Sequence, residues 1–178
     1  MHWIASLSAS LLSVTHIWLD YIMDLRQEIK QKSLFDSGAV ALVNPVNCEG
    51  VMGAGLALEF KTRFPSAFVD YHLRCRNKGL VPGELHTYKM LDGRWIINFP
   101  TKTLWKQKSK IEYVQVGLPA LIDFIKMNAI SSIAVPALGC GLGGLSWPHV
   151  KREIEAAFNT LPSGTVDLIM FEPQTKFA

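Results

Sequence analysis

The chain has 178 residues, of which 49% are hydrophobic and 19% are charged, and its formal net charge is +3. This composition excludes a disordered chain and fits one globular domain with a core of its own. The mildly basic balance permits a nucleic-acid or polyphosphate partner without requiring one.

The first 22 residues, MHWIASLSASLLSVTHIWLDYI, contain no Lys or Arg. They make a poor signal peptide, because a signal peptide starts with basic residues. We also expect no membrane span, because polar residues interrupt each short apolar run and Asp20 would be costly in lipid. We interpret residues 1–22 as an N-terminal extension of unknown role, from an upstream start codon or an appended helix, and residues 23–178 as one domain.

Three cysteines, Cys48, Cys75 and Cys140, form no CxxC pair and have no histidine at zinc-finger spacing. Neither a disulfide framework nor a metal site is therefore expected, and a reducing cytoplasm fits best. Their expected role is as small buried apolar groups. A nucleophilic cysteine with a histidine partner remains an alternative.

Strand-like and helix-like blocks alternate from Gln27 onward. Six expected strands, each rich in Val, Ile, Leu or aromatic residues, are Gln27–Lys32, Ala39–Asn44, Glu84–Met90, Arg94–Phe99, Ser132–Pro136 and Thr165–Phe171. The expected helices are Gly55–Phe64, Ser66–Asn77, Ser109–Met127 and Trp147–Thr160. This order predicts an α/β fold, a three-layer α/β/α sandwich with a mixed central sheet of about six strands, in which Asp92-Gly93 closes an antiparallel hairpin.

The expected helix at Ser109–Met127 carries both a start signal and a defect. Ser109 and Glu112 have the spacing of a capping box, and apolar residues then recur on one face. Pro119 lies inside the pattern, which predicts a kink or a break near Val116.

Three loops that follow apolar strands are rich in special residues: Asn47–Gly55, Pro100–Lys106 and Ala137–Ser146. Binding sites in such folds gather at the carboxyl ends of strands. Four glycines in six residues, from Gly139 to Gly144, free the backbone to turn its N–H groups toward a diphosphate. A single glycine loop is as well explained by a tight turn, and neither loop has Walker or dinucleotide spacing, so the pair of loops carries the prediction.

Three segments together carry a family resemblance: ALVNPVNCEGVMGAGLALEFK at Ala41–Lys61, NFPTK at Asn98–Lys102, and SIAVPALGCGLGGLSW at Ser132–Trp147. The chain resembles a macrodomain, the ADP-ribose-binding fold, from about Glu28 to Pro173. Within that family it most resembles the DarG-type antitoxin macrodomains, which remove ADP-ribose from DNA bases modified by a DarT toxin. The resemblance implies a monomer that acts on single-stranded ADP-ribosylated DNA, with thymine as the base, no cofactor, and a DarT-type toxin as a further partner.

The resemblance also implies which residues bind ADP-ribose. The loop Asn47–Gly55 would enclose the distal ribose, with Asn47 bonding its hydroxyls, and the loop Gly139–Leu145 the diphosphate. Phe171 would lie near the adenine, although a core phenylalanine is the alternative. The full set is Ser33, Asn47, Cys48, Val51, Met52, Gly53, Gly55, Pro100, Thr101, Gly139, Cys140, Gly141, Leu142, Gly143, Gly144, Leu145 and Phe171.

The sequence departs from the family pattern at four places. Lys32 and Ser33 stand where many macrodomains have Gly-Asp, and a hydroxyl bonds adenine more weakly than a carboxylate does. Pro45 replaces the usual threonine, and Leu104 replaces a frequent histidine that could carry a proton. Related terminal ADP-ribose glycohydrolases pair their lysine with an aspartate in the glycine loop, where this chain has Gly143.

Lys102 is the expected catalytic residue. It follows a strand end, and a lysine desolvated there would have a lowered pKa and could act as a base or as a nucleophile toward the anomeric carbon. By the resemblance, the lysine of NFPTK is the residue on which DarG-type activity depends. A solvated loop lysine is the alternative, and Glu49 and His149 are reserve candidates.

Trp105 is interleaved with lysines in the same loop, a mixture that can track a single strand of nucleic acid while stacking a base. The expected nucleic-acid contacts are Trp105, Lys106 and Lys108, and the alternative is a solvated lysine face with a core tryptophan. Two other functions stay open: a non-catalytic ADP-ribose-binding module, and a hydrolase of O-acetyl-ADP-ribose or protein-linked ADP-ribose.

Overall fold

The computed structural model describes residues 33–173, and the chain divides into two units, residues 1–37 and 38–178. In the first unit, the short 3-10 helix η1 (Leu34–Asp36) is capped by Ser33, whose hydroxyl accepts a hydrogen bond from the Phe35 N–H at 3.4 Å. The strand expected at Gln27–Lys32 and the extension 1–22 lie outside the described residues.

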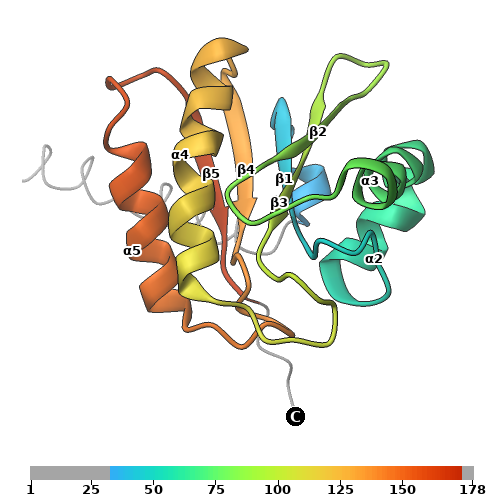
Figure 1. Cartoon of the computed structure of the whole chain (residues 1–178). Coiled ribbons are helices and arrows are strands. Elements are labelled where there is room, and N and C mark those ends of the chain that lie inside the picture. Colours follow the sequence, from blue (N-terminus) through green and yellow to red (C-terminus); the bar gives the residue numbers. More distant parts are fainter. Residues whose placement is uncertain (1–32, 174–178) are drawn as a thin grey trace, which may run out of the picture. The chain divides into compact units, whose positions relative to one another are not determined.

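The second unit is built on a mixed five-stranded sheet with the order β2-β3-β1-β4-β5 (Figure 1). The hairpin strand β2 is antiparallel to β3, as predicted, and the other neighbours are parallel. The strands are β1 (Ala41–Val46), β2 (His86–Lys89), β3 (Trp95–Pro100), β4 (Ser132–Pro136) and β5 (Asp167–Phe171).

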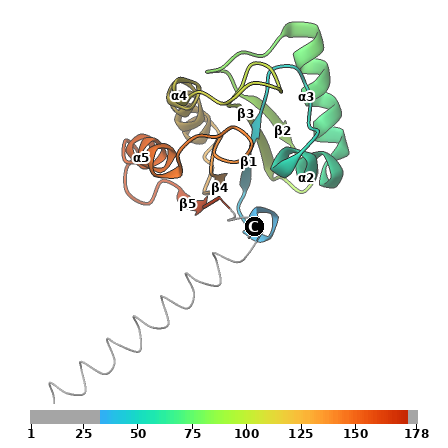
Figure 2. The same ribbon diagram turned by 90° about the horizontal axis from the view of Figure 1, so that it is seen from below.

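Helices cover both faces of this sheet, which confirms the predicted three-layer α/β/α fold class. The pair α2 (Gly55–Arg63) and α3 (Pro65–Lys78) lies on one face, and the pair α4 (Ile111–Met127) and α5 (Trp147–Phe158) lies on the other (Figures 1 and 2). No helix in residues 33–173 is long and apolar enough to cross a membrane.

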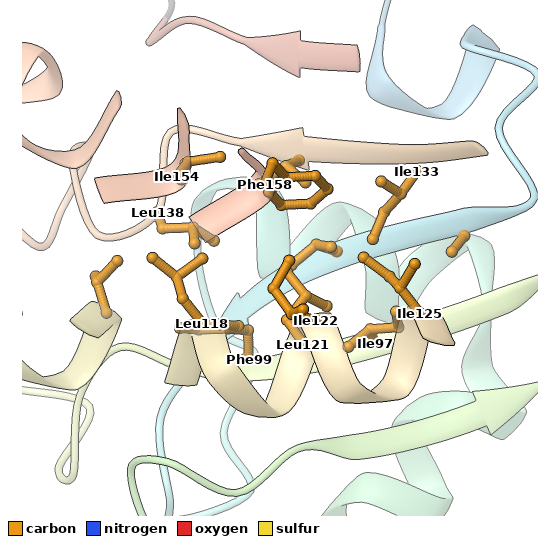
Figure 3. Packing of buried hydrophobic residues seen from close by; sticks show 14 of the residues in the cluster. Ile97, Phe99, Leu118, Leu121, Ile122, Ile125, Ile133, Leu138, Ile154 and Phe158 are labelled. Atoms are coloured by element: carbon orange, nitrogen blue, oxygen red, sulfur yellow. The ribbon is translucent and has the colours of Figure 1, made fainter. Parts of the chain in front are cut away.

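The main hydrophobic core lies between the sheet and the helices α4 and α5. Strand residues alternate between the two faces, so that Ile97 and Phe99 of β3 face this core, whereas Ile96 faces α2 and α3. Figure 3 shows sheet and helix residues interdigitating in the core, including Ile97, Phe99, Leu118, Leu121, Ile122, Ile125, Ile133, Leu138, Ile154 and Phe158.

Strand β1 begins and ends two residues later than the predicted Ala39–Asn44 and contains Pro45. A proline cannot donate to a sheet ladder and is tolerated where a neighbouring strand is missing. The ladder from β1 to β4 covers only Ala41 and Leu42, so Pro45 is paired on the β3 side alone.

The structure contradicts the predicted start of α4 and the predicted break within it. The capping box does not form, because the helix is capped by Lys110 without a side-chain bond, while the Ser109 N–H donates to the Gly143 carbonyl at 3.0 Å. The break near Val116 does not occur either, since the helix runs through the exposed Pro119. Packing explains the continuity: six residues of α4 are buried against the sheet and α5, including Gly117, which lies directly on the Phe99 ring.

Candidate ligand site at the carboxyl ends of the strands

Three loops meet where the parallel strands β1, β3 and β4 end: the β1–α2 loop (47–54), the β3–α4 loop (101–110) and the β4–α5 loop (137–146), at the lower edge of Figure 1. The β3–α4 loop is bonded to both others. The Cys48 N–H donates to the Thr103 carbonyl at 2.9 Å, and Ser109 is bonded to Gly143. The sequence thus predicted correctly that these loops gather at one edge of the sheet.

The outer two loops also approach each other. A β-carbon at Gly55 would lie 3.9 Å from the Leu142 side chain, which is 62% exposed. Gly55 itself has a φ of +56°, a conformation that other residues rarely adopt. The glycine therefore lets the start of α2 lie against the β4–α5 loop.

Asn47 is buried and organises the β1–α2 loop. Its Oδ1 accepts hydrogen bonds from the N–H groups of Glu49 (3.0 Å) and Val51 (3.2 Å), and its Nδ2 donates to the Val51 carbonyl at 2.6 Å. An amide nitrogen has two hydrogens, so one remains for the predicted bond to a ribose hydroxyl. The loop geometry itself depends on this side chain.

Tyr71 also supports the β1–α2 loop, a role that the sequence analysis did not predict. This fully buried residue of α3 donates its hydroxyl to the Asn47 carbonyl at 2.6 Å. Burial raises the pKa of Tyr71 far above its ordinary value, so the phenol stays a donor. In the sequence, Tyr71 reads only as one more apolar helix position.

Several predicted ligand contacts lie with their side chains inside the protein. Met52 is 3% exposed and accepts a bond on its sulfur from Asn44 Nδ2 at 3.8 Å. Pro100 and Thr101 are buried, and the Thr101 N–H donates to the Val46 carbonyl. A ligand could meet these residues through their backbone, whereas Val51 and Gly53 are exposed.

The glycines of the β4–α5 loop are required for different structural reasons, except Gly141. Gly139 and Gly144 have φ angles of +70° and +80°, which favour glycine. A β-carbon at Gly143 would overlap the Ser109 hydroxyl and the Gly139 carbonyl, whereas one at Gly141 meets nothing within 4 Å. The buried Ser109 therefore occupies the space that a side chain at position 143 would need.

Within residues 33–173, three consecutive backbone N–H groups of this loop have no hydrogen-bond acceptor. The N–H groups of Cys140, Gly144 and Leu145 donate to carbonyls within the loop. Those of residues 141–143 have no acceptor among the described residues. Successive free N–H groups in a glycine-rich turn are able to bind an anion. The diphosphate contact of this loop stays a prediction.

Lys102 lies half-buried just after β3, and its carbonyl accepts a hydrogen bond from the Cys48 thiol at 3.3 Å. The pKa of Lys102 is lowered, first by burial and then by the nearby Lys108 ammonium. Within residues 33–173 no carboxylate lies within ion-pair distance of either lysine. The lysine is therefore kept closer to its neutral, reactive form.

Trp105 is on the surface and 52% exposed, so the alternative of a core tryptophan is wrong. Its backbone N–H donates to the Glu49 carboxylate at 2.6 Å, and the Lys106 ammonium lies 5.1 Å from the centre of the Trp105 ring. The Lys108 ammonium is 3.6 Å from the position that a β-carbon on Gly144 would take.

The alternative nucleophiles are not activated. Burial raises the pKa of both Cys48 and Cys140 to about 11, which keeps the two thiols protonated at neutral pH. Among the described residues, no three His, Cys, Asp or Glu side chains gather as a metal site requires. His149, a reserve candidate, is exposed in the first turn of α5.

The two residues expected near the adenine lie in different units of the chain. Phe171 ends β5 opposite Pro136 and is partly exposed. Ser33 belongs to the first unit, where its hydroxyl caps η1. Both adenine contacts stay predictions.

Residues 43–154 match the family model described as Macro domain. The chain belongs to the macrodomain family. The macrodomain of Mycobacterium tuberculosis DarG is 42% identical, with a TM-score of 0.77 over 81% of this chain and 95% of that one.

Two longer relatives contain a similar domain. The DNA ADP-ribosyl glycohydrolase of Mycobacterium tuberculosis is 45% identical over 136 residues, 75% of this macrodomain chain and 38% of that protein. Thermosipho africanus DarTG, solved in complex with ADP-ribose, is 34% identical, with a TM-score of 0.74 over 83% of this chain and 42% of that chain. The chain therefore spans less than half the length of both proteins.

Proposed function

We propose that this macrodomain is a DNA ADP-ribosyl glycohydrolase that removes ADP-ribose from modified DNA bases and so acts as the antitoxin to a DarT-type DNA ADP-ribosyltransferase. The observation that carries the proposal is the placement of Lys102. It lies in the loop that is bonded both to the β1–α2 loop and to the β4–α5 loop with its free N–H groups. The similarity to a DNA ADP-ribosyl glycohydrolase supports the same substrate.

The arrangement assigns a task to each loop. The free N–H groups of residues 141–143 bind the diphosphate, and the β1–α2 loop encloses the distal ribose. Lys102 acts at the anomeric carbon, either by taking a proton from an attacking water or by attacking directly. In both routes the bond from that carbon to the base nitrogen breaks, and the base leaves with the electron pair and takes up a proton. In the first route the attacking water becomes the new hydroxyl of ADP-ribose. In the second route water then hydrolyses the bond between the lysine nitrogen and the anomeric carbon, which releases ADP-ribose and restores the amine.

Replacing Lys102 tests the assignment. The Lys102→Ala variant should release ADP-ribose from modified DNA at least ~100-fold more slowly, the scale for losing a positioned acid–base group, while it still binds free ADP-ribose. Lys110→Ala is the matched control, because its ammonium lies 5.5 Å from the Tyr113 ring centre and not at the loop junction. If Lys102→Ala releases ADP-ribose at the wild-type rate, Lys102 is not catalytic and is a solvated loop lysine.

A substrate panel separates the proposed enzyme from its alternatives. We expect turnover of ADP-ribosylated single-stranded DNA and little turnover of protein-linked ADP-ribose or O-acetyl-ADP-ribose. Because Trp105 and Lys106 offer a stacking surface and a cation, the rate on DNA at limiting substrate should fall as salt rises. A salt-independent rate on an oligonucleotide would contradict a DNA-binding role for this loop, and tight binding without turnover would favour a binding module.

The proposal includes a setting for the protein. We infer a cytoplasmic monomer, supported by three free cysteines, which fit a reducing compartment. A DarT-type toxin as partner is supported by similarity to Thermosipho africanus DarTG.

A further inference from the structure

Lys108 is placed at the β4–α5 loop by its neighbour in the chain. Ser109 is buried under this loop, with its N–H bonded to the Gly143 carbonyl at 3.0 Å and its side chain against Gly139. The backbone of Lys108 is thereby fixed beside the glycines. Its ammonium lies 3.6 Å from where a β-carbon of Gly144 would stand.

Two other lysines of this segment, Lys106 and Lys110, lie beside aromatic rings, whereas Lys102 is near Lys108. Lys106 lies over the Trp105 ring, and Lys110 lies 5.5 Å from the centre of the Tyr113 ring. In the described part of the chain, Lys108 has neither an aromatic partner nor a carboxylate within ion-pair distance. Its charge is therefore available to an anion held by the same loop.

We propose that Lys108 binds the diphosphate of the ligand, together with the free backbone N–H groups of residues 141–143, and does not bind the phosphates of DNA. This inference rests on the proposed function for the identity of the ligand. A charge-assisted bond from an ammonium supplements three neutral N–H donors, since bonds with an ionised partner are about twice as strong as neutral ones. Lys108 thus supplies the formal positive charge that the glycine loop lacks.

Two kinds of phosphate could meet this ammonium, the diphosphate of ADP-ribose and the backbone of nucleic acid, and free ADP-ribose separates them. Its dissociation constant is measured by calorimetry for the wild-type chain and for Lys108→Met, Lys106→Met and Lys110→Met. We expect Lys108→Met to weaken binding about tenfold or more, the scale of one lost charge-assisted hydrogen bond. We expect the two other variants to bind within about twofold of wild type, because surface charges farther away are screened.

Two further measurements test whether charge is the cause. Lys108→Arg should keep most of the affinity for ADP-ribose. In Lys108→Met the slope of log Kd against log salt should be smaller, by the amount expected for the loss of about one ionic contact. Matching thermal melting curves check the fold of this exposed position. If the dissociation constant of Lys108→Met equals that of Lys110→Met, the inference about Lys108 is wrong. The proposed function is unaffected by that result, provided that the wild-type chain binds ADP-ribose and cleaves the DNA substrate. No ADP-ribose binding by the wild-type chain overturns both proposals.

Discussion

Gly141 and Gly143 lie two residues apart in one loop, yet they are predicted to respond differently to a side chain. A β-carbon at Gly143 overlaps a backbone carbonyl and a buried hydroxyl, neither of which can move easily, whereas one at Gly141 meets open space. Gly143→Ala should therefore lower the free energy of unfolding by about 2 kcal/mol, in the range for overpacking, and Gly141→Ala should change it by less than about 0.5 kcal/mol. Urea unfolding of the two variants measures this difference.

The same pair separates folding from binding. Gly141→Val should melt like the wild type, because a β-carbon there meets open space. On the proposed function it should lose ADP-ribose affinity, because a branched side chain next to the free N–H groups of residues 141–143 hinders close approach of the diphosphate. Equal unfolding free energies for Gly141→Ala and Gly143→Ala would contradict the packing of the loop on Ser109.

At the residue scale, the sequence predicted that the loops carrying Lys102 and the glycines meet at one edge of the sheet, because each loop follows a recognisable strand. Their roles in binding and catalysis stay predictions. Ser109 and Tyr71 could not be predicted, because their roles depend on Gly143 and Asn47, residues far away in the chain. Ser109 in addition carried a misleading helix-cap pattern.

Helix α4 offers a test at the scale of one element, because Gly117 and Pro119 are both poor helix residues. Gly117 lies on the Phe99 ring, and an added β-carbon would come within 2.8 Å of a ring carbon. Gly117→Ala should therefore destabilise the protein by about 1–3 kcal/mol despite the better helix propensity of alanine. Pro119 is exposed and lacks an N–H, so Pro119→Ala should stabilise by about 1–3 kcal/mol.

Chemical denaturation of both variants gives the comparison. A stabilising Gly117→Ala would show that α4 can move away from the sheet, and a destabilising Pro119→Ala would show that the proline ring is needed where it lies. The two outcomes are independent, because one residue is buried and the other is exposed.

At the element scale, strand positions were predictable and their ends less so. The runs of branched and aromatic residues gave β4 at Ser132–Pro136 as observed, because both ends coincide with loss of the apolar run. The predicted end of β1 is two residues too early. A proline is expected to end a strand unless one side of the strand is unpaired there, and the ladder from β1 to β4 stops before Pro45. For α4, burial of one face outweighed the local signals at Ser109 and Pro119.

At the scale of the whole second unit, a polar chain crosses from the core to the surface. Asn44 of β1 donates to Asn98 of β3 at 2.8 Å, Asn98 contacts His86 Nδ1 of β2 at 3.0 Å, and His86 Nε2 contacts Asp70 of α3 at 3.0 Å. Because the Asn98 oxygen accepts from Asn44, its amide nitrogen donates to His86. The ring is therefore neutral, with its proton on Nε2 and directed to Asp70. Sequence analysis could not find this chain, because its members belong to four separate elements.

The last prediction is that acid weakens the fold through this chain. Burial lowers the pKa of His86; the Asp70 carboxylate opposes this effect, and Arg74 adds to it. Below the ordinary histidine pKa of about 6.5, the unfolded chain takes up a proton that the folded chain resists, so the free energy of unfolding falls as the pH drops below this value. It should level off once the pH is below the lowered pKa of the folded state. Urea unfolding from about pH 7.5 to about pH 5 should show this slope in the wild type and in the control His149→Gln, but a flatter one in His86→Gln. If His86→Gln keeps the wild-type slope, another group causes the acid sensitivity, because only a titrating His86 makes the two profiles differ.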